Sequence, residues 1–216
     1  MSPDLSRYQF IAIEGNIGSG KTTLANLMAE RYRAKLILEE FADNPFLPQF
    51  YRHPERYSFV LEMSFLAERY QQLKNQLTSL DLFHQLMVSD YLFYKCLIFA
   101  KANLDKDEFT LYNTLFNIIE QALPKPDLLV YLYVDLPRLK DNIRKRGRSY
   151  EQEITDEYLQ RIQDSYFDFF QKHPQQRTLI IETTEIDFLK RPEDFERILE
   201  VMAEDHPEGV SRILLE

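Results

Sequence analysis

Residues 15–22 read Gly15-Asn16-Ile17-Gly18-Ser19-Gly20-Lys21-Thr22, which matches the phosphate-binding pattern G-x-x-x-x-G-K-[ST] at every defined position. An apolar run at residues 8–13 precedes this stretch and a helical pattern follows it, as the motif requires. A turn that needs glycine only for its geometry would also join a strand to a helix. Because three of the chain's 5 glycines lie in this short loop, we expect it, together with Thr23, to bind nucleotide phosphates.

The residue types in this loop suit a phosphate chain and its metal ion. Glycines let several backbone N–H groups face one anion, and the N-terminus of the following helix adds positive potential. Lys21 would place a full charge beside a transferred phosphoryl group, and the Thr22 hydroxyl would bind Mg²⁺. The sequence therefore predicts a nucleotide and Mg²⁺ at this loop.

Apolar runs typical of buried strands recur between longer helical patterns. Strands are expected at residues 8–13, 36–38, 86–88, 128–134 and 178–181. Helices are expected at residues 21–33, 54–77, 92–102, 108–123, 137–146, 155–172 and 192–203. This alternation indicates right-handed βαβ units and an α/β fold of three layers, with a five-stranded parallel sheet flanked by helices. With no repeat or linker in the sequence, we expect residues 1–216 to form a single domain.

Composition excludes several classes of partner and site. The chain carries 26 Lys and Arg against 35 Asp and Glu, a net charge of -9, so general nucleic-acid binding is not expected. The longest apolar run, 128–134, is far shorter than the ~20 residues of a membrane span. A single cysteine, Cys96, excludes an internal disulfide and a Cys-rich zinc site. With no export signal visible at the start, we expect a cytoplasmic protein without membrane partners.

Carboxylates follow two of the expected strands. Glu39 and Glu40 come directly after residues 36–38, and Asp90 comes after residues 86–88. Ligands of parallel sheets bind outside the carboxyl ends of the strands. The glutamates are therefore either a general base or metal ligand, or solvated loop residues. Asp90 either organises Mg²⁺ or caps the next helix, and the two roles are compatible.

A dense positive run lies at residues 142–148. Lys and Arg stabilise the C-terminal end of a helix, and Gly147 is a normal residue just past such an end. Alternatively, residues 144–153 form a short basic lid that closes Arg146 and Arg148 over the nucleotide phosphates and excludes water. The residues alone do not separate the two interpretations.

The ordered set of motifs resembles the deoxyribonucleoside kinases, most closely their bacterial deoxyguanosine kinase branch, over about residues 8–200. The matching segments are GNIGSGKTT, EEFADNPF, YRHPERYSF, LEMSFLAERYQQL, VSDYLFYKCLIFAK and KRGRSYEQ. The resemblance implies a P-loop kinase-type fold and a homodimer joined through helices such as 111–123. It also implies transfer of the γ-phosphoryl group of ATP, with Mg²⁺, to the 5′-hydroxyl of a deoxynucleoside.

The resemblance assigns roles around the nucleoside by position. Glu39 matches the general base that accepts the 5′-hydroxyl proton, although Glu40 stands where the family usually has proline. Tyr51 and Glu151 match the pair that holds the 3′-hydroxyl. The residues matched near the base are Arg69 and a pocket aromatic, Phe99.

Further roles concern ATP and the reacting phosphoryl group. Arg146 and Arg148 match the lid arginines, which act with Lys21 in catalysis. Asp187 and Phe188 resemble the loop that receives the adenine of ATP. The resemblance thus places ATP between the phosphate loop, the lid and this later loop.

Two departures from the family pattern are informative. In many members, an acid follows the third strand and an arginine follows the acid. Here the acid is Asp90, which we expect beside both substrate and metal, and the next residue is Tyr91. Lys95 lies one helical turn after Tyr91 and is either the replacement for that charge or a solvated lysine.

The second departure is Glu62, where many relatives have glutamine. A carboxylate only accepts hydrogen bonds, so it suits the adjacent N1–H and amine of guanine and repels adenine's ring acceptor. The alternative is an acid on the helix surface paired with a lysine or arginine. The base-reading role predicts deoxyguanosine as the preferred substrate, with a deoxyadenosine or broad-specificity kinase as the alternative. Two further alternatives are a nucleoside monophosphate kinase and a regulatory P-loop NTPase. The regulatory NTPase lacks support, because no N-K-x-D motif occurs.

Overall fold

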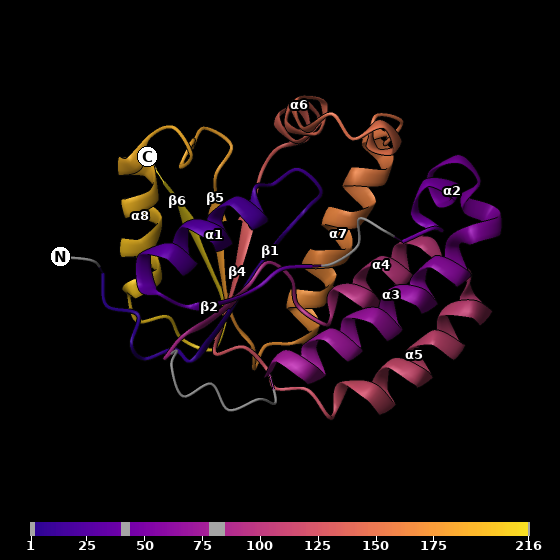
Figure 1. The fold of residues 1–216 in the computed structure, drawn as a ribbon, viewed down its shortest axis with the longest axis horizontal. Helices are drawn as coiled ribbons and strands as arrows, with labels where there is room; N and C mark the ends of the chain where they lie inside the picture. Colours follow the sequence, from indigo (N-terminus) through magenta and orange to yellow (C-terminus); the bar gives the residue numbers. More distant parts are fainter. Residues whose placement is uncertain (1–2, 40–43, 78–84, 216) are drawn as a thin grey trace.

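The computed structural model describes residues 3–39, 44–77 and 85–215, and in this part of the chain six parallel strands form one sheet (Figure 1). The strands are β1 (Phe10–Gly15), β2 (Lys35–Ile37), β3 (Met87–Ser89), β4 (Leu128–Tyr133), β5 (Arg177–Glu182) and β6 (Gly209–Leu214). Their order across the sheet is β2-β3-β1-β4-β5-β6. The expected α/β fold with a parallel sheet is confirmed.

Helices separate the strands, as the sequence predicted. They are α1 (Lys21–Tyr32), α2 (Leu47–Arg52), α3 (Pro54–Leu77), α4 (Lys95–Asn103), α5 (Lys106–Glu120), α6 (Leu136–Arg146), α7 (Asp156–Lys172) and α8 (Pro192–Ala203). A short 3₁₀ turn, η1 (Ser149–Glu151), follows α6. The sequence analysis missed α2 and η1. Within the described ranges, none of the helices has the length and apolar character needed to cross a bilayer.

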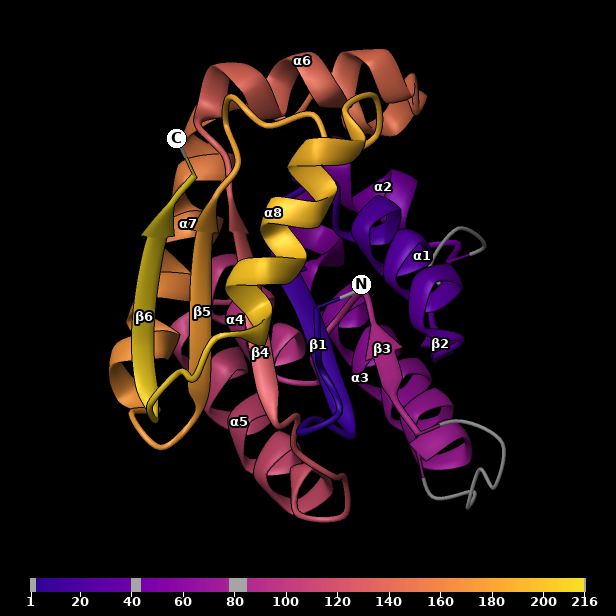
Figure 2. The same cartoon turned by 90° about the vertical axis from the view of Figure 1, so that its left-hand side faces the viewer.

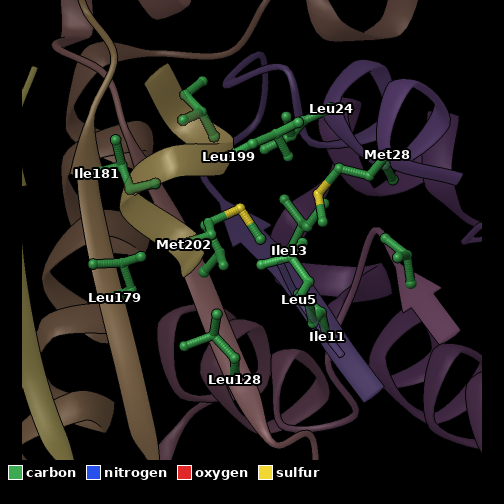
Figure 3. Close-up of a cluster of buried hydrophobic side chains, with 14 of the residues drawn as sticks. Leu5, Ile11, Ile13, Leu24, Met28, Leu128, Leu179, Ile181, Leu199 and Met202 are labelled. Carbon is green, nitrogen blue, oxygen red and sulfur yellow. The ribbon is translucent and has the colours of Figure 1, made fainter. Parts of the chain in front are cut away.

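The helices cover both faces of the sheet. Ile11 and Ile13 of β1 point toward α1 and α8, where they meet Met28 and Met202 in the cluster of Figure 3. The alternate side chains, such as Ala12, point toward α4 and α7 on the opposite face. Helices α3 and α5 pack on the outer side of α4, and α6 lies across one end of the molecule (Figures 1 and 2). The sheet is therefore the central layer of three.

The predicted number of five strands is wrong, because β6 adds a sixth at the edge beside β5. Its side chains alternate between half-buried and exposed positions, and Val210 and Leu214 are exposed. The other strands were recognised as continuous apolar runs, which is the pattern of a strand buried on both faces. An edge strand needs no such run, and the residues of β6 show no regular alternation of apolar and polar types either, so the sequence carries no clear strand signal here.

The topology brings the carboxyl ends of three strands together along one side of the sheet, across the strand direction. β1 lies between β3 and β4, and β3 lies between β1 and β2. All these strands run in the same direction, so the phosphate loop, Glu39 and Asp90 leave the sheet at the same edge. This is the edge at which parallel α/β sheets bind ligands.

Candidate active site

The phosphate loop joins β1 to α1 and has the backbone that such a turn requires. Gly20 has a positive φ of 92°, and a Cβ there would lie 3.0 Å from the ring of Phe188. Lys21 folds back over the loop, where its Nζ donates to the carbonyl oxygens of Gly15 and Asn16, both at 2.9 Å. The lysine charge is thus already held at the loop.

Two asparagine amides fix the loop to helices that come much later in the chain. Asn16 Nδ2 donates to the carbonyl oxygen of Leu159 in α7 at 2.8 Å. Asn142 Nδ2, from α6, donates to the carbonyl oxygen of Gly18 at 2.9 Å. The loop is therefore tied to both helices that flank the lid.

Asp90 follows β3 and connects two predicted site residues. Its Oδ2 accepts a hydrogen bond of 2.6 Å from Thr22 Oγ1, and its Oδ1 accepts one of 2.7 Å from the backbone N–H of Glu39. A hydroxyl and a carboxylate are oxygen ligands of the kind that Mg²⁺ prefers. The helix-cap interpretation of Asp90 is wrong, because α4 begins at Lys95 and its N-cap residue is Tyr94.

Glu39 follows β2 and is bonded by two buried cations. Arg69 of α3 donates from Nε and Nη2 to Oε1 at 2.8 and 2.5 Å, and Lys95 of α4 donates from Nζ to Oε2 at 2.6 Å. Burial raises the pKa of the Glu39 carboxyl, but the charges and hydrogen bonds of Lys95 and Arg69 outweigh it and lower the pKa to about 2. Glu40, the neighbouring candidate, lies outside the described residues.

Tyr91 and Lys95 have different environments although they lie four residues apart. Tyr91 is fully buried in the core, and its hydroxyl donates to Gln72 Oε1 at 2.7 Å. Lys95 lines the pocket described below but is only 7% exposed and bonds Glu39, so its interpretation as a solvated lysine is wrong. Burial, together with the charge of Lys95, lowers the pKa of Lys21 to about 8. The two ammonium groups are therefore close enough to repel each other.

One pocket connects these groups. It encloses about 700 Å³ of space, part of it open to solvent, which is a normal size for a small-molecule site. The predicted site residues that line it are Ile17, Lys21, Thr22, Glu39, Tyr51, Glu62, Arg69, Asp90, Phe99, Arg146, Arg148 and Glu151. Residues assigned from six different segments of the sequence thus surround a single cavity.

Tyr51 and Glu151, the pair expected at the sugar, both lie on this pocket. The ring of Tyr51 stacks on Tyr150, with centroids 6.0 Å apart. Glu151 is 4% exposed, and its Oε1 accepts a hydrogen bond of 3.0 Å from Arg148 Nη1. Glu151 Oε2 is buried and has no hydrogen-bond partner among the described residues. A hydroxyl group of a ligand would supply the missing donor.

The basic run ends a helix, as one interpretation expected, and it also places two arginines at the pocket, while their closing over phosphates stays a prediction. α6 ends at Arg146, and Gly147 has the left-handed φ of 73° that commonly follows a helix. Arg146 and Arg148 nevertheless line the pocket, where Arg146 Nη1 lies 3.8 Å from Glu151 Oε1. The arginines therefore face the same space as the phosphate loop.

Asp187 and Phe188 lie away from this pocket, beside the phosphate loop. Phe188 packs close to Gly20, and Asp187 lines a second, open groove with residues of α6 such as Arg138. The backbone N–H of Asp187 donates to Asp194 Oδ2 at 2.8 Å, which fixes the turn. The contact of Phe188 with Gly20 places this turn next to the phosphate loop, and its role as the adenine loop stays a prediction.

Glu62 is buried rather than on a helix surface, so the surface interpretation is wrong. It is 1% exposed and lines the pocket from α3. Its Oε1 accepts a hydrogen bond of 2.7 Å from Asn103 Nδ2, while Oε2 is buried without a hydrogen-bond partner among the described residues. Burial raises the pKa of this carboxyl to about 7, against the lowering effects of Asn103, Arg69 and Lys95.

A phosphate loop, a basic lid and a pocket between them occur in several kinase families, so the sequence relationship decides among them. The sequence profile of the deoxynucleoside kinases matches residues 11–206. The chain belongs to the deoxynucleoside kinase family. The resemblance seen in the sequence is therefore confirmed, and it favours this kinase activity over a nucleoside monophosphate kinase or a regulatory NTPase.

Relatives of this kinase differ in the base that their names specify. Deoxyguanosine kinase of Bacillus subtilis (strain 168) is 36% identical over 193 residues, covering 88% of this chain and 93% of the relative. Deoxyadenosine kinase of Lactobacillus acidophilus is 31% identical, covering 84% and 88%. The structure of deoxyadenosine kinase from M. mycoides with bound dATP superposes with a TM-score of 0.78 at 24% identity, covering 91% of this chain and 100% of that one. The last similarity confirms the fold.

Sequence reasoning missed two polar residues of the pocket and one buried carboxyl next to the phosphate loop. Asn103, the last residue of α4, bonds Glu62 of α3, and Tyr158 of α7 lines the same pocket. Glu14, at the end of β1, is 1% exposed and accepts hydrogen bonds from the Leu92 N–H and the Tyr166 hydroxyl. No spacing in the sequence indicates these contacts. For Glu14, a charged residue inside an otherwise apolar strand before the phosphate loop was an available signal.

Proposed function

We propose that this kinase transfers the γ-phosphoryl group of ATP to the 5′-hydroxyl of a purine deoxynucleoside, with deoxyguanosine preferred. The observation that carries the proposal is one pocket that joins Lys21 and Thr22 of the phosphate loop to the buried carboxyl of Glu62. ATP enters at the phosphate loop, and the nucleoside occupies the pocket. The described chain acts as a single kinase domain.

Glu39 is the proposed acceptor of the 5′-hydroxyl proton. A carboxylate with a pKa of about 2 is a weak base while Lys95 and Arg69 both bond it. Negative charge on the transferred phosphoryl group attracts Lys95, and movement of the ammonium group toward it would raise the basicity of Glu39. The same movement would place a positive charge where the transition state needs it.

The lysine and arginines divide the remaining work. Lys21 leaves the carbonyl oxygens of Gly15 and Asn16 to bind the phosphates, and Arg146 and Arg148 close over them and exclude water. Each of these groups stabilises charge on the phosphoryl oxygens. This arrangement needs no covalent intermediate with the protein.

The donor set next to the phosphate loop fits Mg²⁺. Thr22 Oγ1 and Asp90 Oδ2 lie 2.6 Å apart, and phosphate oxygens would complete the coordination. Within the described ranges there is no group of three or more His, Cys, Asp or Glu that could hold a metal ion by itself. When bound, Mg²⁺ neutralises charge on the phosphates. Thr22 and Asp90 orient it.

Glu62 is the proposed reader of the base. Its Oε2 has no donor within the described part of the chain, and the N1–H of guanine would supply one. Oε1 already accepts from Asn103 but has a second lone pair for the exocyclic amine. Deoxyadenosine, or several deoxynucleosides, would be the substrate if this carboxyl is protonated at working pH.

The test is a screen of acceptors with ATP and Mg²⁺. We expect phosphorylation of deoxyguanosine, weaker phosphorylation of deoxyinosine and deoxyadenosine, and none of the nucleoside monophosphates. Lys21→Ala serves as the inactive control. A preference for deoxycytidine or for a monophosphate would contradict the proposal.

A homodimer in the cytoplasm, where ATP is available, completes the proposal. Leu111 and Ile118 of α5 are 54% and 68% exposed and lie seven residues apart, so they share one helix face. Such a face suits a second copy of the chain. Ile118→Glu should lower the mass measured by sedimentation from dimer to monomer, whereas a wild-type monomer would contradict this part.

A further inference from the structure

The two oxygens of the Glu62 carboxyl have different partners. Oε1 accepts from Asn103 Nδ2 at 2.7 Å, and Oε2 has no partner among the described residues although it is buried at the pocket. A buried polar atom without a partner is costly. The ligand of the pocket is therefore the natural partner of Oε2.

The cations near Glu62 are committed to another carboxylate. Arg69, from the same helix, and Lys95, from α4, both bond Glu39, which itself faces Glu62 as a like charge. The other titratable groups whose charge acts on or is affected by Glu62 are Cys96 of α4, Tyr112 of α5 and Tyr158 of α7. Burial raises the pKa of each of these three groups, so they stay neutral. Among the residues that the structure describes, Glu62 is therefore buried without an ion pair of its own.

This environment allows Glu62 to bind a proton near neutral pH. Burial raises the pKa of the carboxyl to about 7, and the like charge of Glu39 acts in the same direction. Asn103 donates to Oε1 in either state, so the added proton resides on Oε2. A single atom aimed at the ligand then changes from hydrogen-bond acceptor to donor.

We propose that the protonation state of Glu62 selects the purine. The ionised carboxylate accepts a hydrogen bond from the N1–H of a 6-oxopurine such as guanine, and the neutral carboxyl donates from Oε2 to the bare N1 of a 6-aminopurine such as adenine. This inference rests on the proposed purine kinase activity and deepens it. The mismatched pairs leave two acceptors or two donors facing each other, which discriminates strongly in a buried site.

The experiment measures kcat/KM for deoxyguanosine and deoxyadenosine over a pH series. The series runs from about pH 5.5 to about pH 8.5, so it extends to both sides of the raised pKa of the Glu62 carboxyl. Both bases stay predominantly neutral in this window. For the wild type, we expect the ratio of deoxyguanosine to deoxyadenosine to rise about tenfold or more with pH. Glu62→Gln should give a ratio independent of pH, because an amide does not titrate. Glu55→Gln, an exposed position on the same helix, is the matched control and should behave as the wild type.

A second variant and a second measurement separate base reading from structural damage. Asn103→Ala removes a hydrogen bond that lowers the pKa of Glu62, so the midpoint of the pH change should move upward. Equilibrium affinities for the two nucleosides, measured without ATP, should show the same change of ratio. A structural role alone would weaken both nucleosides equally.

The outcomes are distinct. A ratio that is constant over the window in the wild type overturns the inference, and so does a ratio that still changes with pH in Glu62→Gln. Phosphorylation of both purines at a constant ratio would leave the proposed function standing without this inference. Activity on pyrimidine deoxynucleosides alone would overturn the proposed function, and this inference with it.

Discussion

Lys95 donates to Glu39 at 2.6 Å while Arg69 holds the other oxygen of the same carboxylate. The base expected to receive a proton is thus buried between two cations. Lys95 also lowers the pKa of Lys21, so the two lysines act on the same small region. We expect activity to depend on how these charges redistribute when phosphates bind.

Lys95→Ala tests whether this lysine supplies the charge that is absent at Tyr91. We expect kcat to fall about 10²–10³-fold, as for loss of one group that stabilises transition-state charge. Lys101→Ala is the matched control, because Lys101 lies on the same helix at the surface, where it bonds Asp168. A near-normal rate for Lys95→Ala would show that its role is confined to holding Glu39.

Glu39→Gln should reduce kcat about 10²–10⁴-fold and change KM little, because it removes the proton acceptor and keeps the shape. Steady-state kinetics with deoxyguanosine measure both parameters. The parallel variant Glu40→Gln tests the assignment, since a larger loss there would mean that the general base is the neighbouring residue.

Glu39→Gln should also change the stability of the fold, by an amount that depends on pH. The folded-state pKa of Glu39 is about 2, below that of an unfolded glutamate near about 4.3. Its ionised form therefore stabilises the fold above about pH 4.3, by on the order of 3 kcal/mol, and this contribution is lost as the pH falls through 2. Denaturant unfolding at pH 7 and about pH 3 should show a smaller difference between wild type and Glu39→Gln at the lower pH. An equal difference at both values would place the stabilising effect elsewhere.

Lys21→Ala should abolish phosphoryl transfer and leave the fold intact. Among the described residues, the ammonium group donates to backbone carbonyl oxygens of the loop, so its loss removes transition-state charge without opening the core. The measurements are the rate and the melting temperature. A variant that keeps more than about a tenth of the wild-type rate would be incompatible with a charge worth several kcal/mol.

Arg146→Ala should lower kcat about 10-fold or more, because its guanidinium faces the pocket beside Glu151. Arg144 provides the comparison: it lies on the same last turn of α6 and bonds Asp141 at 3.2 Å on the exposed side. Arg144→Ala should retain wild-type kinetics. Equal losses in the two variants would mean that the basic run acts through helix stability.

The parts of the fold that the sequence predicted are those with strong local signals. The phosphate loop carries a fixed pattern, and the buried strands carry continuous apolar runs, so the βαβ order and the shared edge of Glu39 and Asp90 followed from simple topology. The strand β6 was not predicted, because an edge strand is half exposed. The helix α2 was not predicted, because its six residues make too few turns to show the hydrophobic period of a helix.

The parts of the site that were missed are contacts between distant helices. The bond between Asn103 and Glu62 joins α4 to α3, and the double ion pair of Glu39 joins both helices to the end of β2. Sequence spacing places residues on a face of one helix but does not pair the faces of two. The charge at Lys95 was anticipated only because Tyr91 left a charge unaccounted for.

The amide of Asn142 binds the carbonyl oxygen of Gly18, which joins the helix before the lid to the phosphate loop. The spacing of these two elements is therefore preorganised before any nucleotide arrives. The conformational entropy of assembling them is lost during folding, so in the proposed reaction the binding free energy of ATP remains available for closing Arg146 and Arg148 over the phosphates. Without the Asn142 amide, the phosphate loop and the helix would be ordered against each other only during catalysis, so the entropy cost would fall on catalysis and not on folding.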